Sequence, residues 1–181
     1  ECIKNNVDYI KPNIFRDFED LIKEKKNNSI SLDLVVLTTP SGLHPIQTEI
    51  AANASINVCT EKPMAVDWEG GVKMLEVCKA NNVRLFVVKQ NRLNQTIQLL
   101  KKQIDKKRFG KIALVTINVF WQRPQSYYDQ DKWRGTKDLD GGALMNQASH
   151  YVDLIHWLIG PVEYISSFTS TISRSIESED T

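Results

Sequence analysis

A lysine and a histidine in this sequence stand where a proton could be transferred to or from a ligand. Lys62 lies in Glu61-Lys62-Pro63, directly after an apolar run at 56–60 that predicts a buried strand. His150 follows Asn146 on a predicted helix that begins after Gly141-Gly142. Open α/β sheets bind ligands at the carboxyl ends of their strands. The pattern therefore predicts a site at Lys62 that His150 closes from a separate helix.

Burial would suit Lys62 to this chemistry. A solvated lysine has a pKa of about 10.4, and desolvation at a strand end would lower that pKa into a useful range for proton transfer. Pro63 could hold a cis peptide bond and fix the turn. A surface lysine paired with Glu61 is the alternative, and the residues alone leave both open.

The elements that must position Lys62 alternate along the first half of the chain. Apolar, β-branched runs near 33–39, 56–60 and 84–89 predict strands. Helical spacing separates them at 46–54 and 68–81, after a first helix at 16–26, and Asp67 can cap the helix at 68–81. This alternation predicts a parallel sheet buried on both faces. On the inner face of the helix at 68–81 we expect Val72, Leu75 and Cys78.

The second half of the chain has a different pattern. Asn94 opens a predicted helix that runs to 107, and another helix is predicted over 142–159. The segment 112–121 alternates like a strand of a one-sided antiparallel sheet, and 162–173 predicts a further strand. The fold class is therefore α/β. The change of pattern predicts a domain boundary near Arg92.

The helix over 142–159 has two distinct faces. At about 100° per residue, an apolar face runs from Leu144 to Leu158, and the opposite face holds Asn146, His150, Asp153 and Trp157. The second face points either to water or into a site. Trp157 is a poor choice for a solvated face, and a long loop leads into the helix, which is typical of functional regions.

Two loops carry further groups that could bind a ligand. The segment 38–44 joins a strand end to a helix start, where hydroxyls and free backbone N–H groups suit a polar ligand. His44, next to Pro45, either serves such a ligand or only caps the helix. The loop 122–140 combines arginines with aromatic rings. Guanidinium groups bind carboxylates and phosphates at two points, and an ordinary surface loop is the alternative.

The composition excludes several classes of function. Lysine and arginine number 23 and aspartate and glutamate 22, which gives a net charge of +1. These charges are interspersed, so we expect no nucleic acid partner and no membrane partner. Apolar runs such as 34–37 are too short to span a bilayer. Cys2, Cys59 and Cys78 lack metal-ligand spacing, so we expect no metal site and reduced thiols in the cytoplasm.

Three motifs give the chain a family resemblance. They are Thr39-Pro40-x-x-x-His44, Glu61-Lys62-Pro63 and Gly141-Gly142 leading to His150. With them the chain resembles the Gfo/Idh/MocA oxidoreductases, in which a Rossmann domain precedes an α/β domain with an open sheet. The resemblance implies a partial Rossmann-type domain at 1–92, followed at 93–181 by part of an α/β substrate domain with an open, mainly antiparallel sheet. Stretches such as TPSGLHP, NVFWQRPQSYYD and DGGALMNQASHYVDL resemble one branch, the UDP-N-acetyl-2-amino-2-deoxyglucuronate 3-dehydrogenases of O-antigen sugar biosynthesis (WlbA/WbpB type).

The resemblance implies an NAD-dependent, homo-oligomeric enzyme that oxidises C3 of a nucleotide-sugar uronate. Lys62 would take or relay the hydroxyl proton, and His150 would hydrogen-bond the same oxygen. The resemblance places the cofactor against Thr39, Pro40, Ser41, Leu43, His44, Glu61, Lys62 and Arg134. It places the substrate against Lys62, Arg92, Arg123, Gln125, Tyr127, Tyr128, Asn146 and His150.

The sequence departs from the family pattern in two respects. It lacks the G-x-G-x-x-G turn that holds the cofactor pyrophosphate and ends at Thr181. We therefore expect a chain cut at both ends that is inactive when made alone. Asn146 stands where much of the wider family has Asp, so proton transfer would fall to Lys62, His150 or both. A dehydrogenase of another sugar or polyol, or a binding protein without cofactor, remains an alternative.

Overall fold

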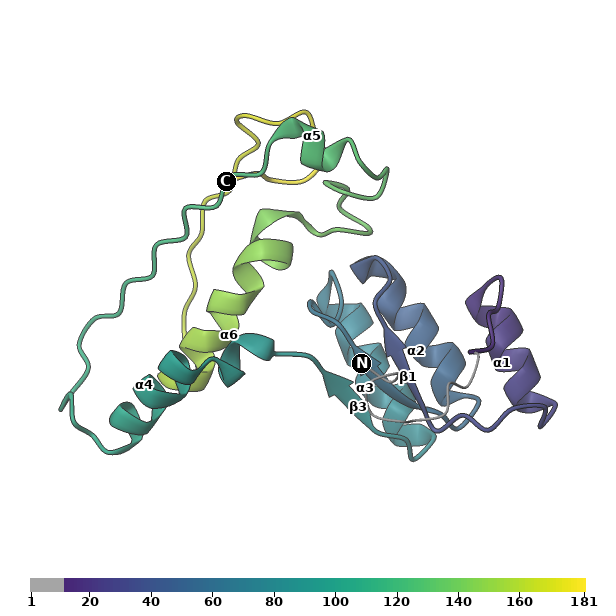
Figure 1. Ribbon diagram of the computed structural model, residues 1–181. Coiled ribbons are helices and arrows are strands. Elements are labelled where there is room, and N and C mark those ends of the chain that lie inside the picture. The colour runs from purple at the N-terminus through teal and green to yellow at the C-terminus, as the bar shows by residue number, and fades with distance from the viewer. Residues whose placement is uncertain (1–11) are drawn as a thin grey trace, which may run out of the picture.

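The computed structural model describes residues 12–181, so Cys2 lies outside the described residues. Figure 1 shows two halves. The first contains a small sheet with helices packed on it, and the second is built from helices and long extended segments. None of the described helices has the length and apolar character needed to cross a membrane.

The first half contains a three-stranded parallel sheet, which confirms the prediction. Strands β1 (Leu34–Leu37), β2 (Asn57–Thr60) and β3 (Leu85–Val87) lie in the order β1-β2-β3. Thr60, at the end of β2, pairs with Leu37 on one side and Val87 on the other. Because the strands are parallel, the segments that follow them leave from the same edge of the sheet.

Three helices accompany the sheet, namely α1 (Phe18–Lys26), α2 (His44–Ala52) and α3 (Trp68–Ala80), and the short turn η2 (Ser41–Leu43) precedes α2. The Asp67 carboxylate accepts the backbone N–H of Gly70 at 2.6 Å, so the predicted cap of α3 is confirmed.

The predicted inner face of α3 was wrong for Leu75, which is 56% exposed. The buried positions of α3 are Gly71, Met74 and Cys78. Gly71 has no side chain, and the methyl group of Met64 fills the space, with its Cε 3.1 Å from where a Cβ would stand. Helix α3 therefore packs on the side that carries Gly71.

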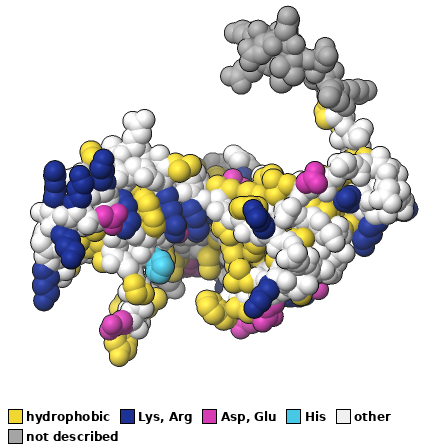
Figure 2. All heavy atoms as spheres, turned by 90° about the horizontal axis from the view of Figure 1, so that it is seen from below, with side chains coloured by type: hydrophobic (Ala, Val, Ile, Leu, Met, Phe, Trp, Pro, Cys, Tyr) yellow, Lys and Arg dark blue, Asp and Glu magenta, His cyan; other side chains and the backbone are white. Residues whose placement is uncertain are grey.

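The core lies on one face of the sheet. It is formed by Ile22, Val35, Leu37, Ala51, Ile56 and Val58. On the other face, Leu34, Val36 and Phe86 are 44%, 58% and 47% exposed. The expectation of burial on both faces is therefore wrong for the described chain, because the packed helices cover only one face. Figure 2 shows hydrophobic side chains gathered over this half of the molecule.

The second half begins with the turn η3 (Gln90–Leu93) and helix α4 (Gln95–Asp105), followed by α5 (Gln125–Tyr128). Asn94 caps α4 as predicted, since its Oδ1 accepts the Thr96 N–H at 3.2 Å. The predicted helix over 142–159 is present as a π-helical segment, η4 (Leu144–Ala148), which continues into α6 (Ser149–Leu158). Short π-helical segments are frequent at functional sites.

The predicted antiparallel sheet is not confirmed. The segments 112–121 and 162–173 are extended (Figure 1), but within the described residues neither forms a strand. A strand needs a neighbour that pairs with its backbone N–H and C=O groups. Here the apolar side chains of these segments stay uncovered, and Phe120 and Phe168 are 90% and 98% exposed.

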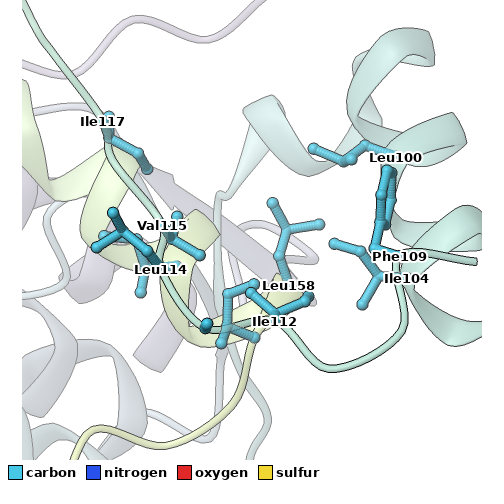
Figure 3. A pocket seen from close by; sticks show the side chains of 11 residues that line it. Leu100, Ile104, Phe109, Ile112, Leu114, Val115, Ile117 and Leu158 are labelled. Atoms are coloured by element: carbon cyan, nitrogen blue, oxygen red, sulfur yellow. The ribbon is translucent and has the colours of Figure 1, made fainter. Parts of the chain in front are cut away.

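An apolar cavity of about 380 Å³ lies between α4, the extended chain that follows it and the end of α6. Figure 3 shows Leu100, Phe109 and Leu158 among its lining side chains. Every residue that lines it is apolar, so the cavity offers no side-chain group for acid–base chemistry.

Candidate active site

Lys62 reaches from the carboxyl end of β2 to the π-helical segment of the other half. Its Nζ donates to the main-chain oxygen of Asn146 at 2.8 Å and to the Oδ1 of the same residue at 3.0 Å. The peptide bond between Lys62 and Pro63 is cis, as predicted. The lysine is thus held at two points by one residue of η4, and this contact joins the two halves.

Two glycines and a glutamate allow η4 to start where it does. Gly141 and Gly142 have φ values of +82° and +89°, which glycine adopts at little steric cost. A Cβ on Gly142 would collide with the Glu179 carboxylate. That carboxylate instead accepts the Leu144 N–H at 2.9 Å, and the Glu179 carbonyl accepts the Ala143 N–H at 3.1 Å. The first free N–H groups of the helix are therefore satisfied.

The pKa of the Lys62 amine is lowered from its usual value, chiefly because burial removes water from the ammonium group. The charges of Lys89 and Arg123 lower this pKa further, while those of Glu61 and Asp140 raise it. Lys62 therefore releases its proton more readily than a solvated lysine does.

His150 shares this electrostatic environment. It is 8% exposed, and its pKa is lowered by burial first and then by the charges of Lys62 and Lys89. A depressed pKa keeps the imidazole uncharged at neutral pH. The ring is therefore suited to hydrogen bonding near Lys62.

Asp140 belongs to the same group, although no pattern in the sequence marked it beyond its place before Gly141-Gly142. It is 2% exposed. Its Oδ2 accepts the Gly135 N–H at 2.7 Å, and its Oδ1 accepts from the side-chain amide of Asn146. A continuous set of hydrogen bonds therefore runs from Asp140 through Asn146 to Lys62.

Arg92 is engaged with Asp153 and does not present a free guanidinium group. Its Nε lies 2.8 Å from Oδ2 and its Nη2 lies 2.6 Å from Oδ1. The guanidinium carbon lies 5.6 Å from the centre of the Trp157 ring. Asp153 and Trp157, on the polar face of α6, therefore contact other parts of the protein. This geometry does not support the predicted substrate role of Arg92.

His44 is buried between the segments that follow β1 and β2. It is 1% exposed, and its Nδ1 and Nε2 lie 3.0 and 3.1 Å from the carbonyl oxygens of Pro63 and Thr39. Through these contacts His44 joins the two loops at the edge of the sheet, and its role at the cofactor stays a prediction. Ser41, also predicted to meet the cofactor, is 6% exposed.

Besides Lys62, four of the predicted cofactor residues remain at least partly accessible at the carboxyl edge of the sheet. They are Thr39, Pro40, Leu43 and Glu61. The Thr39 hydroxyl lies 2.6 Å from the side-chain oxygen of Gln47, and a Glu61 carboxylate oxygen accepts the Lys62 N–H at 3.2 Å. This mixture of apolar and hydrogen-bonding groups fits one end of a dinucleotide, which meets open α/β sheets at this edge.

Arginines and tyrosines of the loop 122–140 form a second group. The guanidinium carbons of Arg123 and Arg134 lie 5.0 and 4.4 Å from the centre of the Tyr127 ring. Tyr127 meets Tyr128 edge to face at 5.1 Å. Arg134 also pairs with Asp131 at 3.0 Å, whereas Arg123 has no carboxylate partner among the described residues. Of this group, Arg123 acts on the first, because its charge lowers the pKa of Lys62.

Gln125, the remaining predicted substrate residue, is occupied by contacts within the protein. Its Nε2 donates to Asp129 at 2.9 Å, and its Oε1 accepts the Ser175 N–H at 2.9 Å. These contacts fix the short helix α5 and so position the tyrosines of that helix.

Both halves of the chain match models of one protein family. Residues 4–89 match the oxidoreductase family with an NAD-binding Rossmann fold, and residues 97–181 match the GFO/IDH/MocA C-terminal domain. With the parallel sheet and the Lys62 site in place, the chain belongs to the Gfo/Idh/MocA family of oxidoreductases.

Within that family the chain is similar to two solved WlbA dehydrogenases, both in complex with NADH and UDP-GlcNAcA. The one from Bordetella pertussis is 54% identical with a TM-score of 0.87, and 92% of this chain covers 46% of that chain. The one from Chromobacterium violaceum is 52% identical with a TM-score of 0.87, and 92% of this chain covers 47% of that chain.

A curated relative acts on a different compound. The 1-carboxy-3-chloro-3,4-dihydroxycyclohexa-1,5-diene dehydrogenase from Comamonas testosteroni is 32% identical over 84% of this chain and 37% of its own length. The chain thus spans about half of the length of the solved structures and less of this relative.

Proposed function

We propose that this chain is part of an NAD-dependent dehydrogenase that oxidises the C3 hydroxyl of UDP-N-acetylglucosaminuronate. One observation carries the proposal. Lys62, with its lowered pKa, is held by Asn146 at the carboxyl edge of a parallel sheet, in the same electrostatic environment as His150. The likeness to two WlbA dehydrogenases solved with NADH and UDP-GlcNAcA supports this substrate.

Bound NAD would supply the acceptor for the hydride. Lys62 accepts the proton of the hydroxyl group. A neutral amine has two N–H bonds and one lone pair, and two donations to Asn146 leave the lone pair for the reacting hydroxyl. His150, which is uncharged at neutral pH, hydrogen-bonds the same oxygen and orients it.

Arg123, beside the Tyr127 ring, is proposed to attract the negative charges of the substrate. Guanidinium groups bind both carboxylates and phosphates, and Arg123 has no carboxylate partner in the described part of the chain. A nucleotide-sugar uronate carries both kinds of group. A cytoplasmic homo-oligomer that supplies O-antigen sugar biosynthesis is the setting that this substrate implies.

The test uses the whole protein that contains this chain. NADH formation is followed with UDP-N-acetylglucosaminuronate, with UDP-N-acetylglucosamine, which lacks the carboxylate, and with inositols. We expect turnover of the uronate and little of the others. Turnover of inositols alone would instead support the alternative of a polyol dehydrogenase.

A variant and its control connect the activity to the site. Lys62→Met should abolish most of the turnover, whereas Lys73→Met, on the exposed side of α3, should leave it unchanged. Equal activities of the two variants would contradict the role of Lys62.

A further inference from the structure

The buried carboxylate of Asp140 is not explained by the reaction proposed above. Its charge has no lysine or arginine partner within 4 Å among the described residues, and the side chain is 2% exposed. A buried charge without compensation is costly. Two donors satisfy it here, the backbone N–H of Gly135 and the side-chain amide of Asn146.

The polarity of these hydrogen bonds fixes the orientation of the Asn146 amide. A carboxylate can only accept, so the amide nitrogen of Asn146 must face Asp140 and its Oδ1 must face away. That Oδ1 is one of the two oxygens that hold Lys62. If the amide were reversed, its oxygen would meet the carboxylate and its NH₂ group would meet the Lys62 amine.

We propose that Asp140 is a positioning residue that sets the orientation of the Asn146 amide and thereby aims the Lys62 amine. This inference rests on the proposed role of Lys62. Asp140 acts through Asn146 and touches neither substrate nor cofactor. Asn146 thus couples a buried charge to Lys62 without itself titrating.

The charge of Asp140 also acts on Lys62 through space. The charged groups that face Lys62 are Glu61 and Asp140, which raise its pKa, and Lys89 and Arg123, which lower it. Loss of the negative charge at position 140 would therefore lower the pKa of Lys62 further. Because this through-space effect does not depend on how the Asn146 amide is turned, a shift of the titration shows that the charge at position 140 reaches Lys62, and the change in kcat tests the positioning.

The first variant is Asp140→Asn in the whole protein. The new amide can keep the Gly135 N–H bond through its oxygen, but its NH₂ group then faces that of Asn146 and forces the Asn146 amide to reverse. We expect kcat to fall about tenfold, the usual effect of losing one hydrogen bond to a charged group. The KM values should change less than about twofold, because no contact to substrate is lost.

The second variant adds Asn146→Asp to Asp140→Asn. The new carboxylate at 146 can accept from the new amide at 140 and from Lys62, and the total charge is unchanged. Because the negative charge now lies next to Lys62, the lysine pKa should rise. We expect kcat to recover most of the loss above that raised pKa. Failure to recover at any pH would overturn the proposal.

A titration independent of turnover separates this proposal from the proposed function. The ¹³Cε signal of Lys62, assigned by its loss in Lys62→Met, should titrate at lower pH in Asp140→Asn than in the unaltered protein. Asp138→Asn removes a charge from an exposed position of the same loop and should leave both the titration and kcat unchanged.

The outcomes distinguish the two proposals. If Asp140→Asn leaves kcat unchanged, Asp140 does not position Lys62 and the inference is wrong, whether or not the thermal stability or the Lys62 titration changes. If the Lys62 titration shifts but UDP-N-acetylglucosaminuronate is not oxidised by the unaltered protein, the proposed function is wrong and the coupling of Asp140 to Lys62 stands.

Discussion

Two nitrogens of the Arg92 guanidinium group donate to the two carboxylate oxygens of Asp153. This pair connects helix α6 to the segment that follows the parallel sheet. His150 lies three residues before Asp153 on the same helix, so the two side chains share one face. The pKa of Arg92 is raised by this hydrogen bond. Because the guanidinium group is occupied, the pair is better placed to hold His150 in position than to bind a substrate carboxylate.

Arg92→Lys and Asp153→Asn should therefore have similar effects in the whole protein. Each should lower kcat. In a double-mutant cycle on the free energy of unfolding, the two changes should couple by roughly 1–3 kcal/mol, as contacting residues do. The exposed pair Lys73 and Glu49, at 2.6 Å, is the control and should couple by at most about 1 kcal/mol. A large rise in KM for Arg92→Lys alone would instead indicate that Arg92 binds the substrate.

The pH dependence of turnover should report the lowered pKa of Lys62. Oxidation needs the neutral amine as proton acceptor, so activity should rise as pH increases through the Lys62 pKa, at a pH below the ordinary value of 10.5. Lys62→Ala should lower kcat by about 10²–10⁴-fold, the usual size of acid–base contributions. A pH profile of kcat/KM for both proteins checks this. An unchanged acid limb in the variant would assign that limb to another group.

Local patterns predicted most of the first half of the fold. Periodicity and caps are properties of neighbouring residues, so the parallel strands and the caps at Asp67 and Asn94 could be identified from the sequence. The pairing of the segment 112–121 could not be identified in this way. An alternating pattern shows which side chains share a face, but it does not identify the neighbouring strand with which the backbone must pair.

The site was predictable in its parts but not in its connections. Lys62, Asn146 and His150 stood out as residue types at element ends. The role of Asp140 depends on a contact with Asn146 that arises only when the loop 131–140 folds back. Whether His44 meets a ligand or two carbonyl groups depends on where Pro63 lies, which no local pattern gives.

Replacing His44 should cost stability, because it joins two loops from the interior. His44→Ala would leave the carbonyl oxygens of Thr39 and Pro63 without this partner and would open a cavity at a position that is 1% exposed. We expect a loss of about 2–4 kcal/mol in the free energy of unfolding. Urea unfolding of the whole protein measures this, and His156→Ala, at an exposed position of α6, should change it by less than about 0.5 kcal/mol.

Gly42, in the turn before α2, contacts the backbone of the loop 131–140. Its N–H donates to the carbonyl oxygen of Leu139 at 3.1 Å. A Cβ at this position would stand 1.8 Å from the carbonyl oxygen of Asp138, a backbone atom that cannot move alone. Gly42→Ala should therefore displace the loop that carries Asp140 and lower the unfolding free energy by about 1–3 kcal/mol.

The same displacement should reach the Lys62 amine. If Asp140 orients Asn146, moving its loop should lower kcat in Gly42→Ala and weaken the response to Asp140→Asn in the double variant. Gly71→Ala is the control, since its new methyl group would meet only the flexible end of Met64 and alanine favours helices over glycine by about 0.5–1 kcal/mol. Kinetics and unfolding are measured for the unaltered protein, Gly42→Ala, Asp140→Asn, the double variant and Gly71→Ala. Additive losses in kcat would mean that Gly42 supports the fold without acting through Asp140.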